Sequence, residues 1–157
     1  MISLVMDTSN SYLAVGLFKD NMCLEAFQEK GSRRQSEKAI PSLKEVLDRH
    51  HIALKDVNEM IITSGPGSYT GVRVAMTIAK TLAAVSDVRI KSVSSLAAYA
   101  GMNQALSVID ARGHKVFVGV YENGLPLIKE QVMTLEDFTQ LRAEYEDFEL
   151  VGEVGCL

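Results

Sequence analysis

Cysteine, proline and tryptophan are scarce in this sequence. Its 157 residues include two cysteines, three prolines and no tryptophan. The two cysteines, Cys23 and Cys156, are far apart in the chain, which argues against a disulfide framework and against a clustered-cysteine metal site. We expect both thiols to be reduced and inert. No apolar run approaches the ~20 residues of a membrane-spanning helix, and no basic segment opens a signal peptide. We therefore expect a cytoplasmic protein that does not associate with membranes.

Positive charge is also in short supply. Lysine and arginine number 16 against 20 acidic residues, so the formal net charge is −4. Basic residues gather only around Lys30, Arg33, Arg34 and Lys38. Because phosphate neutralisation supplies much of the affinity for nucleic acids, we expect no tight RNA binding by this chain alone.

The first half of the chain predicts three strands followed by alternating helix and strand. Apolar runs at 2–7, 12–18 and 22–28 are joined by polar turns at 8–11 and 19–21, which predicts antiparallel neighbours. Helical periodicity at 36–50 begins at Ser36, a residue suited to an N-cap. Pro41 is tolerated best near a first turn, so the regular helix is expected to begin after Ser36. A strand at 59–64 and a helix at 72–85 complete the order βββαβα.

The second half repeats this order in part. A strand at 90–93 leads into a helix that Ser94 or Ser95 caps and that continues to Met102. Strands are predicted at 105–110, 116–121 and 126–132, with a hairpin signal at Asn123–Gly124. Thr134 and Asp137 resemble a capping box for a helix ending near 145, before a strand at 148–151. We expect a duplicated α/β fold with one lobe at 1–88 and a second at 89–157, in which Asp7 and Asp110 end the corresponding first strands.

Several short motifs resemble those of the TsaB (YeaZ) family, in the same order and at similar spacing. They are Met6-Asp7-Thr8-Ser9, Ser36-Glu37, Gly65-Pro66-Gly67-Ser68-Tyr69-Thr70-Gly71-Val72-Arg73, Ser94-Ser95-Leu96 and Ile109-Asp110-Ala111-Arg112. The glycine-rich string is the most specific of them. The sequence departs from the family at Gln35, where members commonly carry histidine, and it stops where the second lobe usually continues.

The resemblance implies an actin-like, two-lobed fold related to that of sugar kinases, with a truncated or shortened second lobe at 89–157. It also implies a non-catalytic scaffold that binds its paralogue TsaD through helices of the first lobe. With the ATPase TsaE, the two would support threonylcarbamoyl transfer to an adenosine beside the tRNA anticodon, so tRNA would be met only indirectly. The same helices would allow a homodimer. ATP or ADP at a site shared with partners is left open.

The turns after Asp7 and Asp110 bear on nucleotide binding. Actin-like ATPases place Asp-x-Gly at these turns, because glycine lets backbone N–H groups approach phosphates. Here Asp7 is followed by Thr8 and Ser9, and the turn after Asp110 has glycine only at 113. We expect no ATP hydrolysis and no cofactor bound by this chain alone. The alternative is an actin-like phosphotransferase that acts on its own.

Two interpretations of the loop from Gly65 to Gly71 follow from the residues themselves. It joins a strand to a helix N-terminus, as phosphate-binding loops do, but it lacks the Walker lysine and Pro66 removes an amide donor. The other interpretation, a rigid turn whose glycines allow close packing, is the one we favour. Arg73 would anchor this loop or meet an anionic group of a partner.

The sequence gives little support for a metal site or for a catalytic nucleophile. His50 and His51 are adjacent and would point ~100° apart on a helix, and His114 stands alone in a predicted turn. We expect no metal site. A stand-alone peptidase is a third hypothesis, which the missing ligand spacing argues against.

The remaining surface suits a partner. Ala75, Ala79 and Ala83 form a smooth ridge on which another helix could pack, and the first helix adds an apolar stripe. We place Ala79 and Leu82 on an exposed arc. The predicted interface comprises Ile40, Leu43, Leu47, Ala75, Met76, Ala79, Leu82 and Ala83. The alternative is that these residues form intramolecular core.

Overall fold

The computed structural model describes residues 1–10, 12–30 and 35–157. Within them the chain divides into two compact units, Met1–Val93 and Ser94–Leu157. This boundary lies after the position that element order suggests, because the strand ending at Val93 pairs with the first sheet. Ser11 of the predicted first turn and Arg33 and Arg34 of the basic cluster lie outside the described residues.

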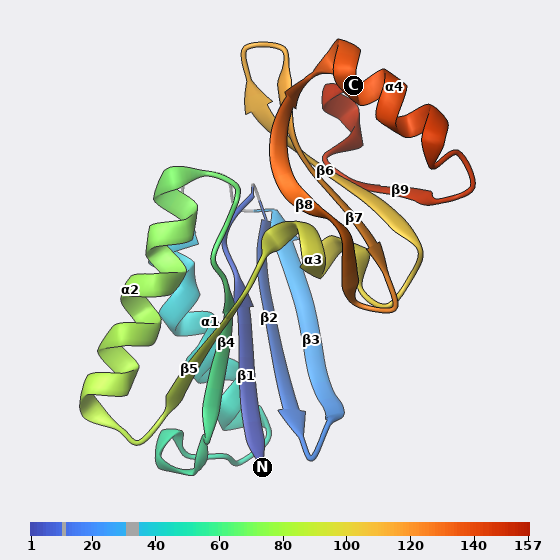
Figure 1. Cartoon of the computed structure of the whole chain (residues 1–157). Helices are drawn as coiled ribbons and strands as arrows, with labels where there is room; N and C mark the ends of the chain where they lie inside the picture. Colours follow the sequence, from blue (N-terminus) through green and yellow to red (C-terminus); the bar gives the residue numbers. More distant parts are fainter. Residues whose placement is uncertain (11, 31–34) are drawn as a thin grey trace. The chain divides into compact units, whose positions relative to one another are not determined.

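The first unit is built on a five-stranded sheet in the order β3-β2-β1-β4-β5 (Figure 1). Its strands are β1 (Ile2–Asp7), β2 (Tyr12–Lys19), β3 (Met22–Lys30), β4 (Glu59–Thr63) and β5 (Arg89–Val93). β1, β2 and β3 are antiparallel neighbours, as the short turns predict, whereas β4 runs parallel to β1 and β5. The carboxyl ends of β1 and β4 therefore meet at one edge of the sheet.

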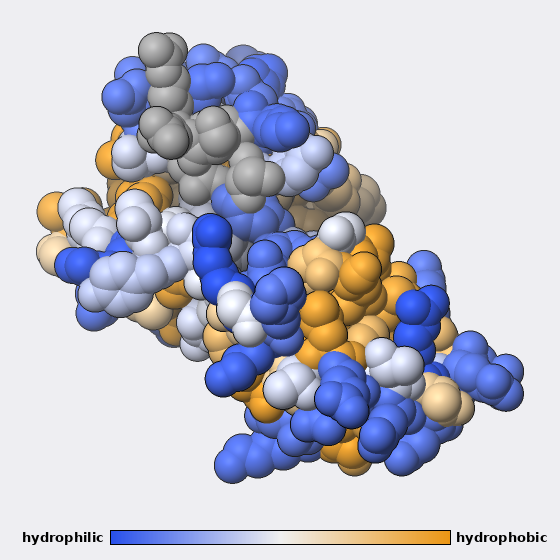
Figure 2. Space-filling view, turned by 90° about the horizontal axis from the view of Figure 1, so that it is seen from above, coloured by the Kyte–Doolittle hydropathy of each residue, from blue (hydrophilic) through white to orange (hydrophobic). Residues whose placement is uncertain are grey.

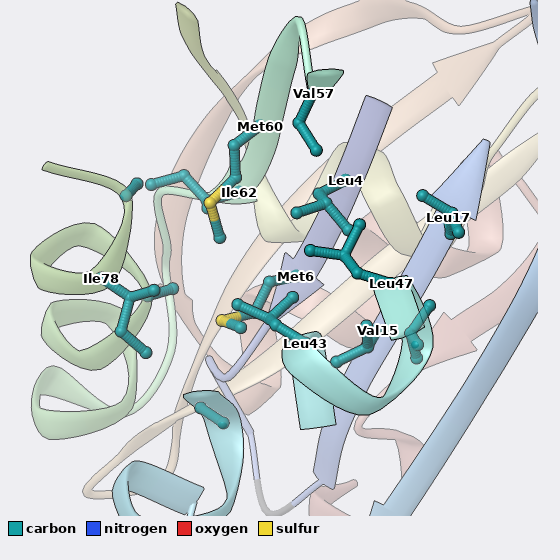
Figure 3. Close-up of a cluster of buried hydrophobic side chains, with 14 of the residues drawn as sticks. Leu4, Met6, Val15, Leu17, Leu43, Leu47, Val57, Met60, Ile62 and Ile78 are labelled. Atoms are coloured by element: carbon teal, nitrogen blue, oxygen red, sulfur yellow. The ribbon is translucent and has the colours of Figure 1, made fainter. Parts of the chain in front are cut away.

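Two helices, α1 (Gln35–Arg49) and α2 (Tyr69–Val85), pack on the same face of this sheet (Figure 1). A short 3₁₀ helix, η1 (Leu54–Asp56), connects α1 to β4. Alternate side chains of the strands face the helices because side-chain direction alternates along a strand. Figure 3 shows Leu43 and Leu47 of α1 and Ile78 of α2 beside the buried strand residues Leu4 and Met6.

Both helices begin earlier than predicted. α1 starts at Gln35, so Ser36 lies inside the helix rather than at its N-cap, and Pro41 lies beyond the first turn. α2 starts at Tyr69 instead of Val72, because the side chain of Ser68 caps it by accepting a hydrogen bond from Gly71 N. Arg73 consequently lies in the second turn of α2, not the first.

The second unit carries a four-stranded sheet in the order β8-β7-β6-β9. Its elements are α3 (Ser95–Ala100), β6 (Ala105–Arg112), β7 (Lys115–Glu122), β8 (Leu125–Thr134), α4 (Leu135–Glu144), β9 (Glu149–Gly152) and η2 (Val154–Cys156). α3 and α4 cover opposite faces of this sheet. α3 packs against Ala105 and Ile109, whereas Phe138 of α4 joins Leu106 and Val108 in a separate hydrophobic cluster.

Four strands of the first sheet and the four strands of the second follow the same order, which confirms the predicted duplicated α/β fold. In each unit an antiparallel three-strand meander is followed by a helix and then by a strand parallel to the first. Asn123 and Gly124 both have positive φ, as the predicted hairpin turn requires. One detail is wrong: β6 does not end at Asp110 but continues through a bulge to Arg112.

The surface mixes apolar and polar residues. Figure 2 shows one face, on which hydrophobic side chains gather in patches among hydrophilic ones. Exposed large apolar residues occur in both units, among them Ile40 on α1 and Val132 on β8. Across residues 1–10, 12–30 and 35–157, no helix has the length and apolar character needed to span a bilayer.

Candidate functional site

The turn after β1 is bound to the loop that precedes α2. Ser68 N donates a hydrogen bond to Ser9 O at 2.8 Å, and Thr8 Oγ1 donates to Gly71 O across 63 positions of sequence. Both Thr8 and Ser9 are buried. The motif residues of the first strand and of the glycine-rich string, far apart in the chain, thus form one structure.

Close backbone contact explains two glycines of this loop. A Cβ atom at Gly71 would lie 2.0 Å from Thr8 O, and one at Gly67 would lie 2.5 Å from Ser9 O. No side chain fits at either distance without a shift of the backbone. Gly71 belongs to the first turn of α2, so the contact fixes the start of the helix against the end of β1.

Asp7 uses one carboxylate oxygen to hold three donors. Its Oδ1 accepts hydrogen bonds from Ser9 N at 2.8 Å, from Ser9 Oγ at 2.6 Å and from Thr63 Oγ1 at 2.6 Å. Thr63 is the last residue of β4, beside the end of β1. Asp7 therefore ties two parallel strand ends and a turn together, which is the role of a structural aspartate.

Amide groups of the glycine-rich loop are also engaged within the protein. Ser68 N donates to Ser9 O, Gly71 N to Ser68 Oγ, and Val72 N to Ser68 O. A phosphate-binding loop instead presents such N–H groups to its ligand. These contacts support the interpretation of residues 65–71 as a rigid turn.

Arg73 stacks on the aromatic ring at the start of α2. Its guanidinium carbon lies 5.3 Å from the centroid of Tyr69, and its Nη1 donates to Tyr69 Oη at 3.3 Å. Tyr69 is 76% exposed, so the pair stands at the protein surface. The geometry suits both roles that the sequence suggests for Arg73: it contacts the loop end, and its charge faces solvent.

A groove runs between α1 and α2. Two adjoining hollows of about 370 and 340 Å³ share Ile40, Thr77 and Ile78 as lining residues. One extends towards Tyr69 and Arg73, and the other towards η1. Its walls are mainly apolar, and Ile40 is 59% exposed at its edge. We call this feature the α1–α2 groove.

The predicted interface residues divide between core and groove. Ala75 and Ala79 are fully buried in the first unit's core, so the expectation that Ala79 lies on an exposed arc is wrong: this side of α2 faces the sheet and α1. Leu43 and Leu47 are also buried but reach the groove floor, which Leu82 and the exposed Ile40 join. Met76 and Ala83 are half-buried.

The second unit has its own polar hollow beside Asp110. Asp110 Oδ1 accepts a hydrogen bond from Arg112 N at 2.8 Å, the same two-residue pattern that Asp7 makes with Ser9 N. Asp110, Arg112, His114, Lys115 and Cys156 line this hollow of about 340 Å³. Asp110 itself is exposed, and its own N–H points to Glu153 Oε2 at 3.3 Å.

Within the described residues, the cysteine and histidine side chains do not form a reactive centre. Burial, and then the nearby charges of Asp110 and Glu153, raise the pKa of the Cys156 thiol, which disfavours the nucleophilic thiolate. Cys23 is exposed on β3. Across the described parts of the chain, no three His, Cys, Asp or Glu side chains gather as metal ligands. The absence of a metal site stays a prediction.

Sequence reasoning missed Thr63 and the lysines near the groove. Thr63 could have been found from the parallel pairing of β1 with β4, which places Met6 opposite Ile62 and hence Asp7 beside Thr63. Lys44 lines the groove, and Lys80 follows Arg73 by two helical turns. Helical spacing alone indicates that Arg73 and Lys80 share a face.

Comparisons with known proteins agree with the motifs. The family model described as TsaD, tRNA N6-adenosine threonylcarbamoyltransferase, matches residues 28–148. The tRNA threonylcarbamoyladenosine biosynthesis protein TsaB of Bacillus subtilis is 32% identical over 92% of this chain and 67% of its own length. The protein of the same name from Escherichia coli is 31% identical over 78% of this chain and 57% of its own length.

Solved structures give the same result. YeaZ from Pseudomonas aeruginosa superposes with a TM-score of 0.76 at 27% identity, covering 84% of this chain and 67% of that one. Our chain thus spans between 57% and 67% of the length of these three relatives. The family match, the sequence identity and the shared fold together show that this chain belongs to the TsaB (YeaZ) family, within the group that the TsaD model describes.

Proposed function

We propose that this chain is a non-catalytic subunit in tRNA threonylcarbamoyladenosine biosynthesis and that it docks a TsaD-type catalytic subunit in the α1–α2 groove. The relatives' names supply the pathway. The observation that carries the docking role is the groove itself, which is apolar, open to solvent and edged by the exposed Ile40. An apolar groove between two helices fits the apolar stripe of another helix.

The motif loops support a role other than catalysis. Asp7 accepts hydrogen bonds from Ser9 and Thr63, and the glycine-rich turn is bonded to Thr8 and Ser9, so these polar groups fix the start of α2 against the end of β1. In this proposal TsaE joins through the complex, tRNA is contacted by the partners, and any ATP or ADP lies at a site that partners complete. Self-association through the same groove would compete with TsaD.

Replacement of Ile40 by glutamate tests the docking role. Ile40 is exposed, so we expect the Ile40→Glu variant to keep its melting temperature and to bind TsaD of the same organism at least ~10-fold more weakly, because a charge would be buried in an apolar contact. Isothermal titration calorimetry with purified TsaD measures the affinity.

The matched control is Val132→Glu on β8, in the other unit, where an exposed apolar residue receives the same charge. This variant should bind TsaD normally. Equal binding by the wild type and the Ile40→Glu variant would refute docking at the groove.

A further inference from the structure

The exposed face of α2 carries positive charge only. Its seventeen residues include Arg73 and Lys80, both exposed, and no aspartate or glutamate. The two cations lie on one face because seven residues span almost two full turns. Lys44 adds a third cation from α1 on the lining of the groove, where Asp48 is the single carboxylate among the described lining residues. Positive charge therefore borders an apolar groove in a chain whose net charge is −4.

These three cations have no carboxylate in ion-pair range within the described residues. Elsewhere on α1, cations are paired: Lys38 Nζ lies 2.8 Å from Glu29 Oε1, and Arg49 pairs with Glu25. Within the described part of the chain, Arg73 contacts the ring and hydroxyl of Tyr69, and that contact leaves its charge unneutralised. The groove and its border thus present an excess of unpaired positive charge, three cations against Asp48, to whatever fills the groove.

Building on the docking role proposed above, we propose that the α1–α2 groove selects a heterologous helix whose apolar stripe is flanked by carboxylates. The apolar stripe fills the groove, and the carboxylates meet Arg73, Lys80 and Lys44. Charges at the border of an interface chiefly accelerate association and exclude wrong partners, and salt screens them. Charge complementarity is therefore the selective element of the site.

These charges disfavour binding of a second copy of this chain in the α1–α2 groove. A two-fold contact places the same surface on both sides, so α2 packed against α2 would bring Arg73 and Lys80 towards their own equivalents. Like charges brought together lower affinity and act against the wrong partner. Self-association should accordingly strengthen as salt increases, whereas binding of the acidic partner should weaken.

The test compares Lys80→Glu with Lys129→Glu, a reversal on β8 in the other unit. Affinity for TsaD and self-association are measured by calorimetry and by analytical ultracentrifugation at about 50 mM and about 500 mM salt. We expect Lys80→Glu to weaken TsaD binding ~5-fold at low salt and less than ~2-fold at high salt, and to strengthen self-association. Lys129→Glu should change neither.

Equal effects of the two reversals, or tighter TsaD binding by Lys80→Glu, would overturn the inference. Failure of TsaD to bind at any salt would instead refute the docking role, and two model peptides then decide the charge preference separately. Both are amphipathic helices with one leucine stripe, flanked by glutamate in one peptide and by lysine in the other. Tighter binding of the glutamate peptide supports the inference, and equal or reversed binding contradicts it.

Discussion

At the scale of single residues, Asp7 links the turn after β1 to the end of β4. Three donors converge on its Oδ1, from the turn that follows it and from the end of β4. The carboxylate that would be expected to act on a phosphate-bound metal in a nucleotide-binding relative is here occupied with the backbone and hydroxyls of its own unit. Removal of the Asp7 carboxylate should therefore chiefly lower the free energy of unfolding.

We expect Asp7→Ala to lower the free energy of unfolding by about 1–3 kcal/mol, because Ser9 and Thr63 lose their acceptor. Asp7→Asn keeps an acceptor oxygen and should cost less. Thr63→Val added to Asp7→Ala should cost little more, since the two changes remove the same contact. Urea denaturation of the wild type, Asp7→Ala, Asp7→Asn, Thr63→Val and the double variant measures these values, and full additivity of Asp7→Ala and Thr63→Val would contradict the proposed link.

Glu59 gives the first unit a dependence on pH. The Lys91 ammonium, 2.9 Å from Oε2, and then the Ser3 hydroxyl hold the pKa of Glu59 below its ordinary value of 4.5. A carboxyl group with a lowered pKa stabilises the folded state fully above its unfolded pKa. That contribution is lost as the pH falls through 4.5 towards the folded value.

The Glu59→Gln variant should therefore be less stable than the wild type at neutral pH, and the difference should shrink in acid. Urea midpoints recorded from neutral pH to below 4.5 test this. A difference that stays constant across this range would show that the Glu59 charge contributes nothing.

At the scale of secondary-structure elements, the start of α2 depends on Gly71. A methyl group there would collide with Thr8 O, so we expect Gly71→Ala to cost ~3 kcal/mol through displacement of the helix from the turn after β1. The control is Gly155→Ala, where no atom lies within 4 Å of the added carbon. Thermal melting of both variants measures the effect, and equal melting temperatures would argue against the contact.

Most elements could be predicted from sequence because their periodicity is strong. Strands β1 and β4 alternate or are uniformly apolar between turn residues, so their positions were predicted to within one residue. Helix starts were missed because caps depend on local hydrogen bonds, such as that of Gly71 N to Ser68 Oγ, rather than on apolar spacing. Pro41 was expected near the first turn but is accommodated deeper inside α1.

Burial on α2 could not be derived from its sequence. The helix is apolar around most of its circumference, so its pattern does not indicate which side meets the sheet. Only the packed structure shows that Ala75 and Ala79 face inward, while Tyr69, Arg73 and Lys80 face outward. For the same reason the sequence predicts interface residues on both helices but not the groove, which needs the two helices at a fixed spacing.

At the scale of the whole molecule, two similar units carry similar turns after their first strands. Asp7 and Asp110 each accept from the N–H two residues later. If the chain were a phosphotransferase, both turns would have to serve a nucleotide. We expect the isolated chain to release no phosphate from Mg-ATP above the buffer rate, and a phosphate-release assay checks this. Turnover that disappears in Asp7→Ala would establish the phosphotransferase instead.

The junction of Thr8 with Gly71 has a mechanical consequence. Because the backbone of α2 rests directly on the turn after β1, the helix cannot shift at its first turn without pushing that turn. A protein that binds α2 and displaces it would therefore also displace the end of β1, where Asp7 lies. Docking at the surface and the conformation of the sheet edge are in this way coupled through the contacts of Thr8 and Ser9 with the start of α2.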